Sequence, residues 1–182
     1  MFCGINGFHY IFKSECEALF SHFNWHLIIM SLHMPNSVIY DDAVYHQGAT
    51  SFLTKRLNPH NGGTHIGMYL AWVILNRLES FQLRQAAASP VEEVRSKQMS
   101  GRDFLFSHCE GKLTSDALNK EAQAFTAVYY EAEYLRDYED ILVAKATATY
   151  MVEDSWANYE RLAVVMDRRL RDYRGLQPAA AS

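Results

Sequence analysis

The feature that most constrains this chain is the stretch NGGTHIGMYLAWVILNRL at residues 61–78, which is apolar on nearly every side of a helix. Gly62 and Gly63 permit a tight loop before it, and Thr64 is of the residue type that caps helix N-termini. A helix without a polar face must be enclosed by other elements. We therefore expect a buried central helix over residues 64–79 with the rest of the fold packed around it.

Further helices are signalled on the C-terminal side of this stretch. Ser89 and Ser100 each stand before a short helical segment as capping residues, and apolar side chains recur every three or four residues between positions 114 and 138. Asp154 or Ser155 is expected to cap a last helix. The pattern predicts an all-α, mainly helical fold: a compact single-domain bundle of about five to six helices around the central one.

Composition supports one folded domain with short extensions. Hydrophobic residues make up 49% of 182 residues and aromatic residues 13%, which is enough for a substantial core. Residues 34–175 are predicted to form the domain, and residues 1–33 are interpreted as an N-terminal extension that is non-native or poorly ordered, with Met34 as the natural start. Residues 176–182 are expected to be a disordered tail. Residues 141–150 fit either a short strand or an extended connector.

Charge and cysteine usage exclude several classes of protein. The net charge is −4 and the pI is near 6.0, which argues against a nucleic-acid-binding surface. The three cysteines are widely spaced, so that neither a disulfide framework nor a zinc knuckle is indicated and a reducing cytoplasm is expected. No apolar run is long enough to cross a bilayer. The sequence leaves the oligomeric state open.

One group of side chains suggests metal chemistry. Asp42 and His46 have the spacing of neighbours on a helix, and His65 stands in the first turn of the central helix. If the two segments pack together, Asp42, His46 and His65 form a three-ligand metal site with room for water. In the alternative interpretation the aspartate is a helix cap and the histidines only hydrogen-bond neighbouring groups. We assign no catalytic residue and expect no cofactor, and these three residues are the metal candidates.

Three motifs together resemble a known group of proteins. They are YDDAVYHQGA at residues 40–49, GGTHIGMYLAWVI at residues 62–74 and YMVEDSWANYERL at residues 150–162. They are similar to motifs of a family of small uncharacterised bacterial proteins, a domain of unknown function, over about residues 39–174. This chain has Tyr45 where that family has tryptophan, and Gly63 where alanine is common. The resemblance favours Met34 as the natural start and implies no particular reaction.

Three functions fit these observations. The preferred hypothesis is a non-enzymatic binding protein, such as an immunity-type inhibitor of a protein toxin partner, because acidic side chains speed association with a basic partner. The alternatives are a metal-dependent enzyme that uses Asp42, His46 and His65, and a structural or oligomerising helical module. The candidate residues for partner binding are Asp41, Glu153, Asp154, Trp156 and Tyr159.

Overall fold

A computed structural model of the chain describes residues 37–47, 58–143 and 148–176. These residues are mainly helical, as predicted, and a small two-stranded sheet accompanies the helices. The predicted extension at residues 1–33 and residues 177–182 of the predicted tail lie outside the described residues, and those expectations stay predictions; Leu176, the first residue of the predicted tail, is helical. No helix in the described ranges combines the length and the apolar character that a membrane span needs.

The central helix is α4 (Thr64–Leu75), and it is buried along almost its whole length. Every residue from Thr64 to Ile74 is buried, so that the predicted enclosure is confirmed. The helix ends at Leu75 and not at residue 79, because Arg77 adopts a left-handed conformation with φ of 58° that reverses the chain. Leu78 still returns to the core, where it is 3% exposed.

The start of α4 also differs from the prediction. Thr64 was expected to be the N-cap, but Gly63 occupies that position after the 3₁₀ turn η1 (Pro59–Gly63). The Thr64 hydroxyl instead accepts a hydrogen bond of 3.3 Å from the Arg102 guanidinium. This bond connects the first turn of α4 to helix α7 (Gly101–His108), which contains Arg102.

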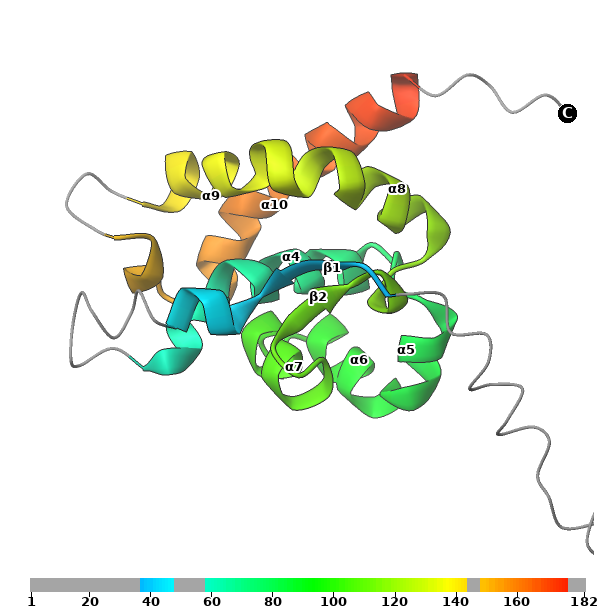
Figure 1. The fold of residues 1–182 in the computed structure, drawn as a ribbon, viewed down its shortest axis with the longest axis horizontal. Coiled ribbons are helices and arrows are strands. Elements are labelled where there is room, and N and C mark those ends of the chain that lie inside the picture. Colours follow the sequence, from blue (N-terminus) through cyan, green and yellow to red (C-terminus); the bar gives the residue numbers. More distant parts are fainter. Residues whose placement is uncertain (1–36, 48–57, 144–147, 177–182) are drawn as a thin grey trace, which may run out of the picture. The chain divides into compact units, whose positions relative to one another are not determined.

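Helices on two sides enclose α4. One side consists of α5 (Phe81–Ala86), α6 (Ala88–Arg95) and α7 (Gly101–His108), and the other of α8 (Lys120–Tyr129), α9 (Leu135–Leu142) and α10 (Trp156–Leu176), as Figure 1 shows. The predicted caps at Ser100 and Ser155 are confirmed, because their hydroxyls accept backbone N–H bonds from Asp103 and Asn158. Ser89 caps nothing, since α6 begins before it and its hydroxyl donates to Glu93.

Two glycines bring the backbones of α4 and α7 into direct contact. A Cβ atom on Gly67 would lie 2.4 Å from the backbone nitrogen of Arg102, and one on Gly101 would lie 2.0 Å from the carbonyl oxygen of Gly67. Neither position has space for a side chain. This contact fixes α7, and with it Arg102, against the first half of α4.

The predicted long helix over residues 114–138 starts later than expected and is interrupted once. Its first residues form strand β2 (Lys112–Thr114) and the 3₁₀ turn η2 (Ser115–Ala117), and Asn119 caps α8. Further on, the π-helical turn η3 (Tyr130–Tyr134) joins α8 to α9. A π turn holds more residues than an α turn, so that it changes the direction in which the following side chains point.

The structure contains a strand at residues 39–42 that was not predicted from the sequence. Strand β1 (Ile39–Asp42) pairs antiparallel with β2, and Asp42 lies opposite Lys112. Residues 43–47 then turn into a short helix. Further along the chain, α9 continues to Leu142, and Thr149–Met151 forms the 3₁₀ turn η4. The described part of residues 141–150 therefore contains no strand.

Candidate metal centre

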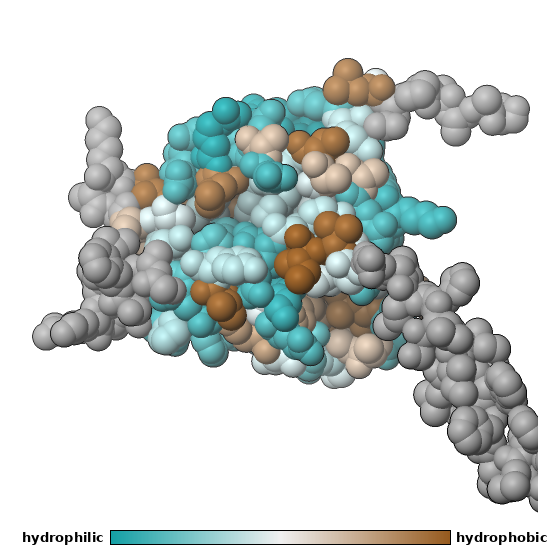
Figure 2. Space-filling model, viewed as in Figure 1, coloured by the Kyte–Doolittle hydropathy of each residue, from teal (hydrophilic) through white to brown (hydrophobic). Residues whose placement is uncertain are grey.

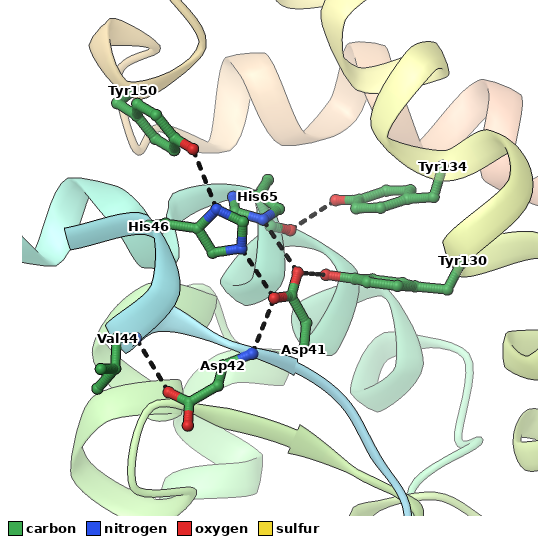
Figure 3. A network of polar contacts seen from close by, with 8 residues as sticks. All are labelled: Asp41, Asp42, Val44, His46, His65, Tyr130, Tyr134 and Tyr150. Atoms are coloured by element: carbon green, nitrogen blue, oxygen red, sulfur yellow. Dashed lines mark hydrogen bonds and ion pairs between the residues drawn. The ribbon is translucent and has the colours of Figure 1, made fainter. Parts of the chain in front are cut away.

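Three side chains from three separate elements meet at the N-terminal end of α4. Asp41 comes from β1, His46 from the helical residues 43–47, and His65 from the first turn of α4. The Asp41 carboxylate bridges the two imidazoles, with Oδ1 2.8 Å from His46 Nε2 and Oδ2 3.2 Å from His65 Nε2 (Figure 3). One ligand atom from each residue lies within 4.8 Å of the others.

The predicted convergence of His46 and His65 is observed, but the carboxylate is Asp41 and not Asp42. Asp42 was expected to share a helix face with His46, whereas it ends a strand and the helix begins at the next residue. Successive side chains of a strand point to opposite faces, so that only one of the two aspartates can face the histidines. The Asp42 carboxylate instead accepts a 2.9 Å hydrogen bond from the backbone N–H of Val44 and caps the short helix.

Three tyrosines, none of them predicted as site residues, surround the cluster. The Tyr130 hydroxyl donates to Asp41 Oδ2 at 2.9 Å, and the Tyr134 hydroxyl donates to the His65 carbonyl oxygen at 2.6 Å. Both tyrosines belong to the π turn η3, which directs them toward β1 and α4 (Figure 3). The Tyr150 hydroxyl lies 3.0 Å from His46 Nδ1. No local sequence signal marks these tyrosines, because their direction depends on the π turn and on contacts between distant segments.

The electrostatics of the cluster favour a neutral histidine beside an ionised carboxylate. Burial lowers the pKa of His65, whose side chain is only 3% exposed. Burial alone would raise the pKa of Asp41, but hydrogen bonds from His46 and His65 outweigh it and hold that pKa well below its usual range. Among the described residues, Asp41 forms ion pairs only with these two histidines. No arginine or lysine in the part of the chain that the structure describes pairs with this negative charge.

These residues fit a metal ion of the zinc class. Two imidazole nitrogens and one carboxylate oxygen are the protein ligands of many catalytic zinc sites, in which water fills the remaining position. The same ligand types also suit other divalent transition metals. Protein metal sites usually orient each histidine ligand through a hydrogen bond to its second ring nitrogen. At His46 the Tyr150 hydroxyl occupies that role.

The residues predicted to bind a partner do not form a shared exposed surface. Asp41 belongs to the cluster, and Asp154 forms a largely buried ion pair of 3.2 Å with Arg102. Tyr159 is buried, and the indole nitrogen of Trp156 donates to a backbone carbonyl. Glu153 alone among the five candidates is exposed.

The fold and the cluster together define a mainly helical domain with a His-His-Asp site at the start of its central helix. The chain matches the sequence profile of the family described as "Domain of unknown function (DUF7832)" over residues 39–152, and it belongs to that family. The predicted membership of an uncharacterised domain family is thereby confirmed, and the matched range includes the whole cluster and its three tyrosines. No curated protein and no solved structure matches the chain.

Proposed function

We propose that this domain binds a divalent transition-metal ion, with zinc as the best fit, through Asp41, His46 and His65. The observation that carries the proposal is the convergence of three ligand atoms within 4.8 Å of one another, contributed by three separate elements. Such a group differs from an exposed acidic cluster, because the His65 side chain is 3% exposed and the Asp41 side chain 15% exposed. The fold therefore brings these groups close together.

The charge balance of the site supports the same function. A buried carboxylate is costly without a cation, none of the described lysines or arginines pairs with Asp41, and a divalent ion would supply a positive charge there. Three protein ligands leave a tetrahedral ion with one position for water, whose acidity the ion would increase. The proposal therefore favours a metal-dependent protein whose chemistry takes place at this open position, in agreement with the enzyme alternative from the sequence.

Zinc titration of purified, chelator-treated protein tests this function. We expect one zinc ion per wild-type chain, and affinity at least about 100-fold weaker in Asp41→Asn, His46→Ala and His65→Ala, because each substitution removes a direct ligand. The matched control is Asp42→Asn, which changes the adjacent aspartate that caps the helix and should retain zinc binding. Absence of zinc binding by the wild-type protein, or equal loss in Asp42→Asn and Asp41→Asn, would overturn the proposal.

A second candidate is binding of a protein partner, for which an apolar surface near β1 is the specific observation. Four side chains in this part of the chain are 54–79% exposed: Val38, Ile39, Val44 and Tyr45. Figure 2 shows apolar side chains on the face of the molecule that carries β1. Exposed apolar groups of this kind often mark a contact surface. A toxin of a bacterial cytoplasm, neutralised in the manner of an immunity protein, is the partner that this candidate proposes.

Co-expression with the product of the neighbouring gene tests the second candidate. A complex that forms with the wild-type chain and is lost in Val44→Glu would support partner binding. Failure of the neighbouring product to bind, or to be toxic without this protein, would count heavily against it. Size-exclusion chromatography of the same variant separates this function from an oligomerising module, in which Val44→Glu would instead dissociate copies of the chain itself.

A further inference from the structure

Tyr150 forms hydrogen bonds through both its side-chain hydroxyl and its backbone carbonyl. Its hydroxyl lies 3.0 Å from His46 Nδ1, and its backbone carbonyl accepts a 3.1 Å hydrogen bond from the Asn61 side chain. Asn61 in turn accepts a 3.1 Å hydrogen bond from the guanidinium of Arg102, which the glycine contact of α4 and α7 holds in place. On the other side of the turn, the Thr149 hydroxyl donates to Glu139 at 2.6 Å. These bonds fix the backbone of the turn from which the Tyr150 side chain extends to His46.

The positions of the protons around His46 follow from the hydrogen bonds of Asp41. An ionised carboxylate can only accept, so that His46 Nε2 must carry a hydrogen and donate it to Asp41 Oδ1 at 2.8 Å. A neutral imidazole carries a single N–H, which leaves Nδ1 as an acceptor. In the neutral form of His46 without metal, the Tyr150 hydroxyl is therefore the donor in this bond.

A metal ion at the cluster would reverse this bond. When Nε2 of His46 uses its lone pair to bind the ion, the single hydrogen of the neutral ring must reside on Nδ1. Nδ1–H then donates to the tyrosine oxygen, which becomes the acceptor. No proton leaves the imidazole as a whole, because the hydrogen only changes from one ring nitrogen to the other through exchange with water.

We propose that Tyr150 is a positioning residue of the metal centre, whose hydroxyl supports His46 as a donor without metal and as an acceptor with metal. This inference rests on the metal-binding function proposed above. A hydroxyl can donate and accept, whereas a carboxylate or carbonyl at the same place could only accept and would stabilise the metal-bound tautomer alone. A hydroxyl partner is compatible with both the metal-free and the metal-bound tautomer of His46. This compatibility suits a metal ion that binds and dissociates.

The test compares zinc affinity in Tyr150→Phe with that in the wild type. Loss of a hydrogen bond to a ligating histidine should weaken zinc about 10-fold, the lower end of the range for such partners. The matched control is Tyr45→Phe, because Tyr45 is 79% exposed and lies one residue from His46; its affinity should not change. Thermal melts of the metal-free variants confirm that both are folded.

A second measurement reads the proposed reversal directly in the wild-type chain. Nitrogen-15 spectra that correlate the imidazole nitrogens with the ring protons, recorded at about pH 8 where histidine is ordinarily neutral, distinguish the two tautomers. We expect Nε2–H at His46 without metal and Nδ1–H with zinc. Equal zinc affinity of Tyr150→Phe and wild type, or an unchanged tautomer upon zinc binding, would overturn the inference. If wild-type protein binds no zinc at all, the proposed function itself fails.

Discussion

Asp41 and Asp137 are two largely buried aspartates in the same molecule, and they are stabilised in different ways. Their side chains are 15% and 11% exposed, and each accepts a hydrogen bond from a tyrosine hydroxyl. Tyr130 donates to Asp41 at 2.9 Å, and the preceding Tyr129 donates to Asp137 at 3.0 Å. Arg169 adds two hydrogen bonds of 3.0 Å to Asp137, whereas Asp41 receives two imidazoles. The difference lies in the counter-ion: a permanently charged arginine pairs with Asp137, whereas within the described ranges only histidines pair with Asp41.

Two other largely buried carboxylates follow the pattern of Asp137. Glu79 lies 2.6 Å from a guanidinium nitrogen of Arg95, and Asp154 lies 3.2 Å from Arg102. Arginine keeps its charge at any ordinary pH, so that such pairs serve the fold without responding to conditions. Asp41 departs from this pattern where two potential metal ligands meet, and we interpret the departure as functional.

The largest effect on stability is expected from the removal of the permanent counter-ion. Arg169→Met leaves Asp137 without its cation and should lower the free energy of unfolding by about 2–4 kcal/mol, somewhat below the range for fully buried pairs because Arg169 is 29% exposed. Urea unfolding measures this change. Arg168→Met on the exposed side of the same helix is the control. A loss of unfolding free energy in this variant as large as in Arg169→Met would contradict the role of Arg169 as the counter-ion of Asp137.

Zinc should stabilise the protein through Asp41 and independently of Asp137. At about 100 times its dissociation constant, zinc is expected to raise the free energy of unfolding of the wild type by about 2.7 kcal/mol, since it binds the folded state. The same increment should appear in Arg169→Met and be absent in Asp41→Asn. Unfolding curves with and without zinc provide the measurement, and an increment that survives in Asp41→Asn would contradict the assignment of the ligand.

Acid should remove the contribution of Asp41 to the stability of the metal-free protein. Its folded pKa is lower than its unfolded value, so that the carboxylate stabilises the fold above the ordinary aspartate pKa of about 3.9, and this stability is lost as the pH falls toward the folded pKa. The difference in unfolding free energy between wild type and Asp41→Asn should therefore decrease below about pH 4. A difference that stays constant from pH 4 downward would show that the carboxylate is not stabilised as described.

The smallest effects are expected from the two consecutive tyrosines, which form a matched pair. Tyr129→Phe and Tyr130→Phe each remove one hydroxyl bond to a buried carboxylate and should each cost about 1 kcal/mol without metal. Only Tyr130→Phe should also weaken zinc, by about 10-fold, because its hydroxyl orients a metal ligand. Calorimetric titration of the two variants measures the contrast, and equal zinc affinities would remove the distinction between the two aspartates.

The parts of the fold that local sequence could predict are those set by local interactions. The buried course of α4 follows from an apolar run with no polar face, and the caps at Ser100 and Ser155 follow from hydroxyls placed before helical segments. The presence of His46 and His65 in the site could also be predicted, since both lie beside turns that the sequence marks. These features depend on neighbours within a few positions.

The choice between Asp41 and Asp42 depends on interactions that the local sequence does not contain. Strand β1 exists because it pairs with β2, about seventy positions further along the chain, and only this pairing decides which aspartate faces α4. Tyr150 likewise reaches His46 across 104 positions. The choice of Asp42 as the partner of His46 on a helix face was reasonable from spacing alone and was wrong, because pairing with a distant strand makes Asp42 the end of β1.

The π turn between α8 and α9 has a consequence for how this protein tolerates changes in length. Because the turn contains an extra residue, the side chains beyond Tyr134 are rotated by roughly 100° from the course of an uninterrupted α-helix. Tyr129 before it and Asp137 after it can therefore meet across the helix while Tyr130 and Tyr134 point to the cluster. Deletion of one residue here would restore a regular α-helix and rotate the residues after the turn relative to those before it. Tyr129 and Asp137 would then no longer meet while Tyr130 and Tyr134 reach the cluster. The site therefore depends on the number of residues in this turn as well as on their identity.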